Sequence, residues 1–192
     1  MAYNPKIHNR QSIRLKGYDY SKPGFYFVTM VVQNRRRLFG DIKKGMSYPN
    51  QAGTMITKWY TELENKFPNV RCHEKIVMPD HFHCIIEITV GADLDVADLD
   101  VADLSVCPKH PAMPRGEHGG SPLGTILQWF KTMSTNEYIR KVKSNDWQRF
   151  DGKLWQRNYY ERIITNKEAF YRVSEYIRNN PMKFEEDRQQ VK

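Results

Sequence analysis

The sequence has little of what marks secreted or membrane-spanning proteins. Its 192 residues include three cysteines, Cys72, Cys84 and Cys107, whose number and spacing fit neither a disulfide framework nor a zinc finger. No apolar run approaches the roughly 20 residues that a membrane-spanning helix needs. The opening MAYNPKIHNR holds no apolar core of a signal peptide. We therefore expect a protein of the reducing cytoplasm that does not act on a membrane.

Acidic residues are also scarce relative to basic ones. Lysine and arginine number 30 against 22 aspartate and glutamate residues, which gives a formal net charge of +8 and a pI near 9.3. A basic chain of this size suits a polyanionic partner, most simply nucleic acid, and we then expect association with the nucleoid. A solvated basic surface without a partner would have the same composition, so charge alone does not choose between them.

One acidic segment interrupts the pattern of the rest. Residues 92–106 read ADLDVADLDVADLSV, a five-residue repeat with five aspartates and no lysine or arginine, and a stretch rich in proline and glycine follows. Three copies are too few to bury a continuous core. We expect residues 91–120 to be a disordered insertion in a single domain that spans residues 1–192.

The remaining sequence alternates between two periodicities. Period-two alternation and apolar runs predict strands at 25–33, 70–78 and 81–88, and a fourth, less regular strand within 154–164. Apolar residues at helical spacing predict helices at 50–67, at 121–142 and from a capping box at 165–168 to Pro181. Two helices over one face of an antiparallel sheet predict an α+β fold of the ferredoxin-like or RRM-like type, with an added C-terminal helix.

Two histidines begin the third predicted strand, in the sequence MPDHFHCIIEI at 78–88. Because successive residues on a strand point to opposite faces, His81 and His83 project together and Phe82 points the other way. Neutral imidazoles held side by side suit a divalent cation. Two unrelated histidines near a strand end would look the same, so their spacing alone leaves both interpretations open.

A metal ion in a basic protein suggests chemistry on phosphodiesters, in which the cation polarises the phosphate. Such a reaction needs a nucleophile, and Tyr159 and Tyr160 lie in an aromatic, basic segment before the last helix. On an extended chain these two tyrosines face opposite ways, so only one of them can reach the metal. Core packing and base stacking are the alternative roles for both.

Six blocks, spread over nearly the whole chain except the acidic repeat, resemble one known family. They are IRLKGYDYSKPGFYFVT (13–29), LFG (38–40), VMPDHFHCII (77–86), LGTILQWFK (123–131), LWQRNYYERII (154–164) and YIRNNPMKF (176–184). In this order they resemble the REP-associated tyrosine transposases, a family of the single-tyrosine HUH transposase superfamily. The His-hydrophobic-His motif is unspecific alone and becomes specific in this context.

The resemblance implies an RRM-like HUH fold with Mg²⁺ or Mn²⁺ on His81 and His83. It implies an enzyme that cuts and rejoins single-stranded DNA at hairpins of repeated extragenic palindromes, through a 5′-phosphotyrosine intermediate and a free 3′-OH. In the family's Trp-Gln-x-x-Tyr pattern Tyr159 matches the nucleophile, and the adjacent Tyr160 is the next choice. Relatives in the superfamily are often homodimers, which this sequence does not itself indicate.

The third metal ligand is a departure from the family pattern. Related enzymes place a polar residue four positions after the tyrosine, and here that position is Ile163. Glu161 is the substitute candidate, because it would share a face with Tyr159 on an extended chain. Candidate phosphate contacts are Arg14, Lys16, Arg35, Arg36, Arg37 and Lys131. A non-catalytic RRM-like nucleic-acid binder derived from such a transposase and a metal-dependent hydrolase are the alternative functions.

Overall fold

The structure, a computed structural model of the chain, describes residues 23–89, 122–144 and 147–190. Its strands are β1 (Gly24–Val31), β2 (Gly40–Lys43), β3 (Met46–Pro49), β4 (Val70–Val77), β5 (His81–Ile88) and β6 (Tyr160–Ile164). Its helices are α1 (Gln51–Lys66), α2 (Pro122–Ser144) and α3 (Lys167–Gln190), and a 3-10 turn, η1, spans Gln33–Arg35.

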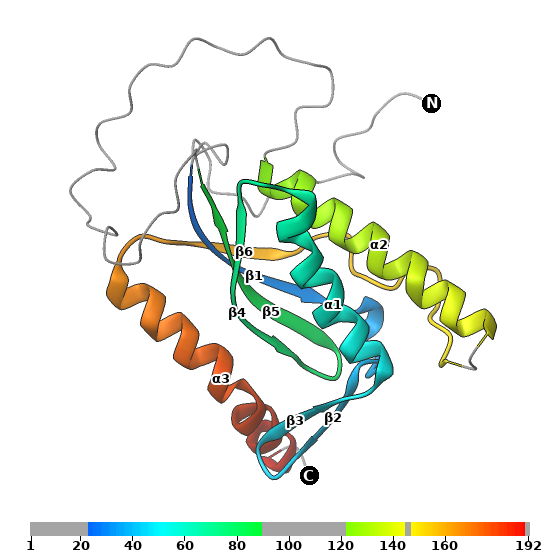
Figure 1. Ribbon diagram of the computed structural model, residues 1–192. Coiled ribbons are helices and arrows are strands. Elements are labelled where there is room, and N and C mark those ends of the chain that lie inside the picture. Colours follow the sequence, from blue (N-terminus) through cyan, green and yellow to red (C-terminus); the bar gives the residue numbers. More distant parts are fainter. Residues whose placement is uncertain (1–22, 90–121, 145–146, 191–192) are drawn as a thin grey trace, which may run out of the picture.

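Four strands form one antiparallel sheet in the order β4-β5-β1-β6. In the sequence, α1 lies between β1 and β4, and α2 lies between β5 and β6. Leaving aside the short strands β2 and β3, these elements form two consecutive strand–helix–strand units (Figure 1). This is the ferredoxin-like arrangement that the periodicities predict. The C-terminal helix α3 is present as expected.

The two faces of the sheet belong to two separate cores. On one face, apolar residues of β1 and β5 such as Tyr26, Val28 and Phe82 are fully buried under α1 and α2. On the other face, Phe170, Val173 and Ile177 of α3 pack on Phe25, Ile85 and Ile164 of the sheet. That second core covers only one end of its face, and the end that carries His81 and His83 lies beyond it.

Helix α1 begins where its sequence predicts. The side chain of Asn50 accepts a hydrogen bond from the backbone N–H of Gly53 at 3.0 Å, which satisfies one of the unpaired donors of the first turn. The helix ends at Lys66, two residues before Pro68. At α3 the cap is Asn166, whose side chain accepts from the N–H of Ala169 at 2.7 Å, rather than Thr165 of the predicted capping box.

A small hairpin between β1 and α1 was not predicted. Strands β2 and β3 have four residues each and are joined by Lys44 and Gly45, both with positive φ, 51° and 67°. Strands this short carry too few alternating residues to show a period. The hairpin lies beside the C-terminal end of α3 (Figure 1).

Helix α3 runs through Pro181, where the sequence predicts that it stops. An interior proline removes a backbone donor and costs about 3 kcal/mol or more. Contacts further along offset this cost: Met182 lies against Gly45, and the Glu185 carboxylate accepts a hydrogen bond from the Gly45 N–H. The predicted end of this helix at Pro181 is therefore wrong, and the helix continues to Gln190.

The fourth sheet strand is shorter than the predicted range. Only 160–164 pair with β1, whereas Leu154 and Trp155 are buried in the core under α1 and α2 and Trp155 forms an isolated bridge with Val32. The acidic repeat, the whole 91–120 segment and residues 1–22 with Arg14 and Lys16 lie outside the described residues. Among the helices of the described part, none is both long and apolar enough to span a bilayer.

Candidate active site

Strand β5 brings the two predicted metal ligands together. His81 and His83 alternate with Phe82, which is fully buried in the core under α1 and α2. The two imidazole rings lie 4.6 Å apart between centroids at an interplanar angle of 78°. Both are largely shielded from solvent, with 8% and 4% of their surface exposed. The two histidines therefore lie side by side on one face of the strand, as strand geometry predicts.

A hydrogen bond at Nδ1 orients the ring of each histidine. Nδ1 of His81 lies 2.6 Å from Oδ1 of Asp80, and Nδ1 of His83 lies 2.7 Å from Oγ1 of Thr29. Because an ionised carboxylate only accepts, Nδ1 of His81 donates in this hydrogen bond, which directs Nε2 away from Asp80. An acceptor that fixes Nδ1–H and frees Nε2 is the arrangement found behind metal-bound histidines.

The electrostatics keep His83 neutral and Asp80 ionised. Burial, helped by the charge of His81, lowers the pKa of His83 to about 3, so its ring is neutral at physiological pH. Burial alone would raise the pKa of Asp80. The hydrogen bond from His81 and the charges of His81 and Arg35 outweigh burial and lower it. Asp80 therefore stays a carboxylate behind His81.

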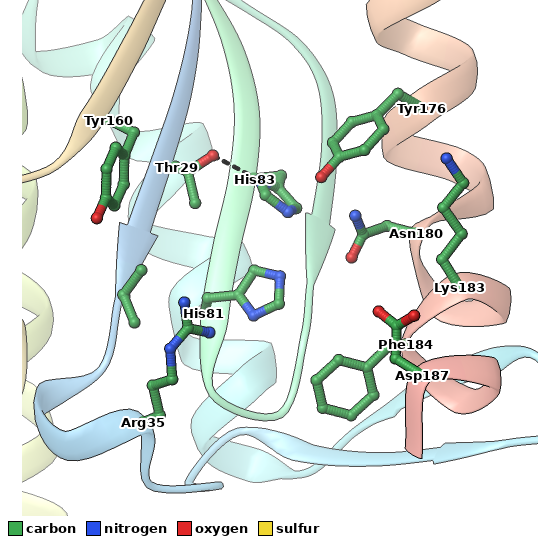
Figure 2. A pocket seen from close by; sticks show the side chains of 11 residues that line it. Thr29, Arg35, His81, His83, Tyr160, Tyr176, Asn180, Lys183, Phe184 and Asp187 are labelled. Carbon is green, nitrogen blue, oxygen red and sulfur yellow. Dashed lines mark hydrogen bonds between the residues drawn. The ribbon is translucent and has the colours of Figure 1, made fainter. Parts of the chain in front are cut away.

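The two histidines form part of a pocket of about 370 Å³ between the sheet and the C-terminal half of α3 (Figure 2). Strands β1, β5 and β6 supply one side, η1 supplies the rim and α3 supplies the other side. The residues that line it are Thr29, Val31, Arg35, His81, His83, Tyr160, Tyr176, Asn180, Lys183, Phe184 and Asp187.

The structure separates the two adjacent tyrosines, as alternation predicts, but in the reverse of the expected order. Tyr160 pairs with Thr29 across β6 and β1, so it lies on the histidine face and lines the pocket. Tyr159 packs against the core on the opposite face, beneath α2. The Trp-Gln-x-x-Tyr match favoured Tyr159, and the strand register instead brings its neighbour to the histidines.

Helix α3 contributes a third tyrosine that the sequence interpretation missed. The ring of Tyr176 lies 5.6 Å from the ring of His83, and Figure 2 shows its hydroxyl pointing into the pocket. One turn later Asn180 faces the same pocket and is only 7% exposed. The spacing Tyr176, Asn180, Phe184 places all three on one helix face, and this periodic signal could have been read from the sequence.

The predicted substitute ligand does not reach the histidines. Glu161 pairs with Val28, whose side chain lies on the face covered by α1 and α2. Sharing a face with Tyr159 thus removes Glu161 from the pocket, which corrects the expectation. Glu87 shares the histidine face but hydrogen-bonds His73 at 2.7 Å instead. Within the described ranges, no three residues of the types His, Cys, Asp and Glu gather around a possible ion.

Of the three consecutive arginines, one faces the pocket. Arg35 lines its rim, with 66% of its side chain exposed, and its guanidinium lies 3.5 Å from the Asp80 carboxylate. Arg36 pairs with Asp151 at 3.1 Å, and Arg37 pairs with Asp41 at 2.7 Å. Exposed ion pairs of this kind are weak, so they do not prevent Arg36 or Arg37 from meeting phosphates.

Lys131, one of the candidate phosphate contacts, is half-buried. Its ammonium donates to the backbone carbonyls of Gln156, Arg157 and Asn158 at 2.9, 3.3 and 3.4 Å, and it lies 5.4 Å from the ring centroid of Tyr159. Burial lowers its pKa to about 8. Lys131 thus holds the segment before β6 in place, and its contact with phosphate stays a prediction.

The fold has a counterpart among solved structures. The chain is similar to the solved structure of a REP-associated tyrosine transposase bound to a REP hairpin, with a TM-score of 0.55 and 18% identity over 89% of this chain and 73% of that one. The sheet, the paired helices and α3 thus have the fold of that transposase, as the sequence resemblance implies.

The sequence comparison places the chain in a family. An uncharacterized protein of Haemophilus influenzae is 35% identical over 185 residues, which cover 96% of this chain and 95% of that protein. The chain belongs to the same family as this Haemophilus protein. No protein-family model matches the chain.

Proposed function

We propose that the protein is a metal-dependent transposase that cuts and rejoins single-stranded DNA at hairpins through a covalent phosphotyrosine. The observation that carries the proposal is the pair His81 and His83, each fixed through Nδ1, in one pocket with the hydroxyl of Tyr176. The likeness to a transposase bound to a REP hairpin suggests the same kind of DNA partner.

The residues present fit a Mg²⁺ or Mn²⁺ ion. The Nε2 atoms of His81 and His83 are available, and the amide oxygen of Asn180 is a third donor of a type that these ions accept. Asn180 stands four positions after Tyr176, which is the spacing that related enzymes use. The apparent departure at Ile163 disappears once Tyr176 is taken as the nucleophile. A bound ion would polarise a phosphate oxygen.

Tyr176 is the best-placed nucleophile of the three tyrosines. Its hydroxyl points toward the histidines (Figure 2), and the ammonium of Lys183 lies 5.6 Å from its ring centroid, where it would favour negative charge on the phenol oxygen. Attack forms a bond between this oxygen and phosphorus and breaks the bond from phosphorus to O3′. The phenol loses its proton, O3′ gains one, and the later attack of a 3′-OH reverses the exchange.

The test uses 5′- and 3′-labelled single-stranded hairpins from the genomic neighbourhood of the gene, with Mn²⁺ or EDTA, on a denaturing gel. Wild type should form a protein–DNA adduct that needs metal. Tyr176→Phe should remove it, because phenylalanine keeps the ring and lacks the attacking oxygen. Tyr171→Phe is the matched control, since Tyr171 lies on the same helix, is 55% exposed and does not line the pocket.

Each other outcome points elsewhere. Loss of the adduct in Tyr159→Phe or Tyr160→Phe, with Tyr176→Phe active, would move the nucleophile to that tyrosine. Tight binding without an adduct on any hairpin would favour the non-catalytic binder. Cleavage without an adduct that survives all three changes would indicate water as the nucleophile and a metal-dependent hydrolase.

A second measurement addresses the metal alone. Mn²⁺ titration by calorimetry should show one site, and Asp80→Asn should weaken it by roughly 10- to 100-fold, because the residue behind a ligating histidine tunes its basicity and orientation. Asp41→Asn is the control, since Asp41 is a 62% exposed carboxylate paired with Arg37 outside the pocket. Equal Mn²⁺ affinity in wild type and Asp80→Asn would contradict the assigned ligands.

A further inference from the structure

Tyr160 is an aromatic side chain whose position is explained neither by its packing against the described residues nor by the proposed chemistry. Strand β6 is an edge strand, and Tyr160 stands at its start, opposite Thr29 and on the histidine face. Its side chain is 55% exposed although it lines a pocket. The second core, which α3 forms on this face, does not include it.

We propose that Tyr160 is a stacking platform for one unpaired base of the DNA strand that enters this pocket, and not a nucleophile. The proposal rests on the function proposed above and names a feature of its substrate, an unstacked nucleotide beside the cleaved phosphate. Base–aromatic stacking is insensitive to sequence because every base has a π-face, so one exposed tyrosine can serve any nucleotide.

The pocket beside Tyr160 has room for part of a nucleotide. The pocket, at about 370 Å³, is at the small end of ligand sites, which run from about 300 to 1,000 Å³. Figure 2 shows Tyr160 on the side opposite α3, with the histidines between them. A phosphate at the histidines would therefore leave its attached base within reach of the Tyr160 ring.

Basic side chains lie around the pocket and on the same face of the sheet as Tyr160. Arg35 is at the rim of the pocket and largely exposed, and Lys183 lines the α3 side. Arg162 follows Tyr160 by two residues on β6, pairs with Phe27 and is exposed on the same face. An aromatic ring between guanidinium groups is the pattern of single-strand binding surfaces, in which cations follow the backbone and rings stack on bases.

The experiment separates stacking from nucleophilic attack by two substitutions at one position. Tyr160→Phe keeps the ring and removes the hydroxyl, and Tyr160→Ala removes both. Binding is measured by fluorescence anisotropy in EDTA, in the Tyr176→Phe background, against a hairpin series in which each unpaired nucleotide in turn is abasic. Tyr171→Ala is the control for loss of an exposed aromatic elsewhere on the surface.

The expected result is a loss of affinity of roughly 5- to 150-fold in Tyr160→Ala and none in Tyr160→Phe. At one abasic position, the affinity of the parent protein should fall by the same factor, and the affinity of Tyr160→Ala should fall no further. The reason is that removing the ring and removing the base abolish the same stacking contact. Tyr160→Phe, with Tyr176 restored, should still form the covalent adduct with Mn²⁺.

Failure of this inference differs from failure of the proposed function. If the hairpins bind and Tyr160→Ala binds as tightly as its parent at every abasic position, the platform is refuted and the transposase proposal stands. If Tyr160→Phe loses the adduct, Tyr160 is the nucleophile and the platform is again refuted. If no hairpin binds to any variant, both proposals fail.

Discussion

At the scale of single residues, folding lowers the pKa of His83 and so keeps its ring neutral for metal binding. It is 4% exposed, hydrogen-bonded to Thr29 and stacked on Phe27 with ring centroids 5.4 Å apart. Neutral imidazole can sit in this environment and imidazolium cannot, because burial penalises the charge and His81 stands beside it. The environment that keeps His83 neutral, and so able to bind a cation, also makes the folded protein less stable in acid.

We therefore predict a pH-dependent free energy of unfolding that originates at His83. Its pKa is about 3 when folded and about 6.5 when unfolded, so the unfolded state binds more protons between these values. Stability is full above pH 6.5 and falls as the pH drops toward 3, by up to about 1.4 kcal/mol per pH unit. Urea unfolding from pH 7.5 to 4.5, in EDTA, measures this slope.

His83→Asn is the comparison, because asparagine fills a similar volume and does not titrate. The variant should be less stable at pH 7.5 and should show a flatter pH dependence below 6.5. Parallel curves for wild type and His83→Asn would assign the acid sensitivity to other groups. The measurement needs no activity, so it tests the environment of His83 independently of the proposed reaction.

The residues of the site were predictable to different degrees for a physical reason. His81 and His83 could be paired from the sequence because strand alternation is local and holds wherever the strand goes. Tyr176 and Asn180 could not be placed beside them, because that depends on where α3 crosses the sheet. The exchange of Tyr159 for Tyr160 depends on the pairing register with β1, which no pattern within 154–164 contains.

At the scale of elements, helix α1 is held against the β2–β3 hairpin by a glycine. A Cβ atom at Gly53 would lie 2.3 Å from the carbonyl oxygen of Phe39 and 2.7 Å from Cβ of Pro49. Both neighbours belong to the backbone or a proline ring, so neither can move aside as a flexible side chain would. The N–H of Gly53 also donates to the capping side chain of Asn50.

Gly53→Ala is therefore expected to destabilise the protein, although alanine favours a helix interior by about 1 kcal/mol over glycine. The steric conflict costs more, and we expect a net loss of about 1–3 kcal/mol. In a melting experiment this corresponds to a decrease of roughly 2–10 °C. Thr61→Ala, an exposed position on the same helix, should stay within about 0.5 kcal/mol of wild type. An unchanged or higher melting temperature for Gly53→Ala would contradict the close packing of α1 on the hairpin.

Some helices and strands follow from local sequence signals, and others depend on contacts between distant segments. Strands β1 and β5 and helix α1 appear close to their predicted ranges, because each carries a long apolar pattern and α1 also a cap. The β2–β3 hairpin and the continuation of α3 past Pro181 depend on each other, through Gly45 and its contacts with Met182 and Glu185. Such mutual support joins segments more than a hundred residues apart, beyond the reach of any window along the sequence.

At the scale of the whole molecule, the distribution of charge governs how a DNA strand would approach. The chain carries a formal net charge of +8, and five of its acids stand in the repeat at 92–106. A polyanion is attracted by the summed charge of the protein, with counterion release making that attraction sensitive to salt. The repeat opposes this attraction wherever it lies within a Debye length of the bound strand, about 10 Å at 0.1 M salt.

Replacing the aspartates of the repeat by asparagine should therefore strengthen binding of single-stranded hairpins at low salt. The variant changes Asp93, Asp95, Asp98, Asp100 and Asp103. We expect roughly 3- to 10-fold higher affinity at 50 mM salt by fluorescence anisotropy in EDTA, and a difference that vanishes near 500 mM as screening shortens the range of these charges. A repeat with the same residues in scrambled order is the control and should bind as wild type does, because its charge is unchanged. Equal affinities of the asparagine variant and wild type at 50 mM would mean that the repeat stays beyond the electrostatic reach of the bound strand.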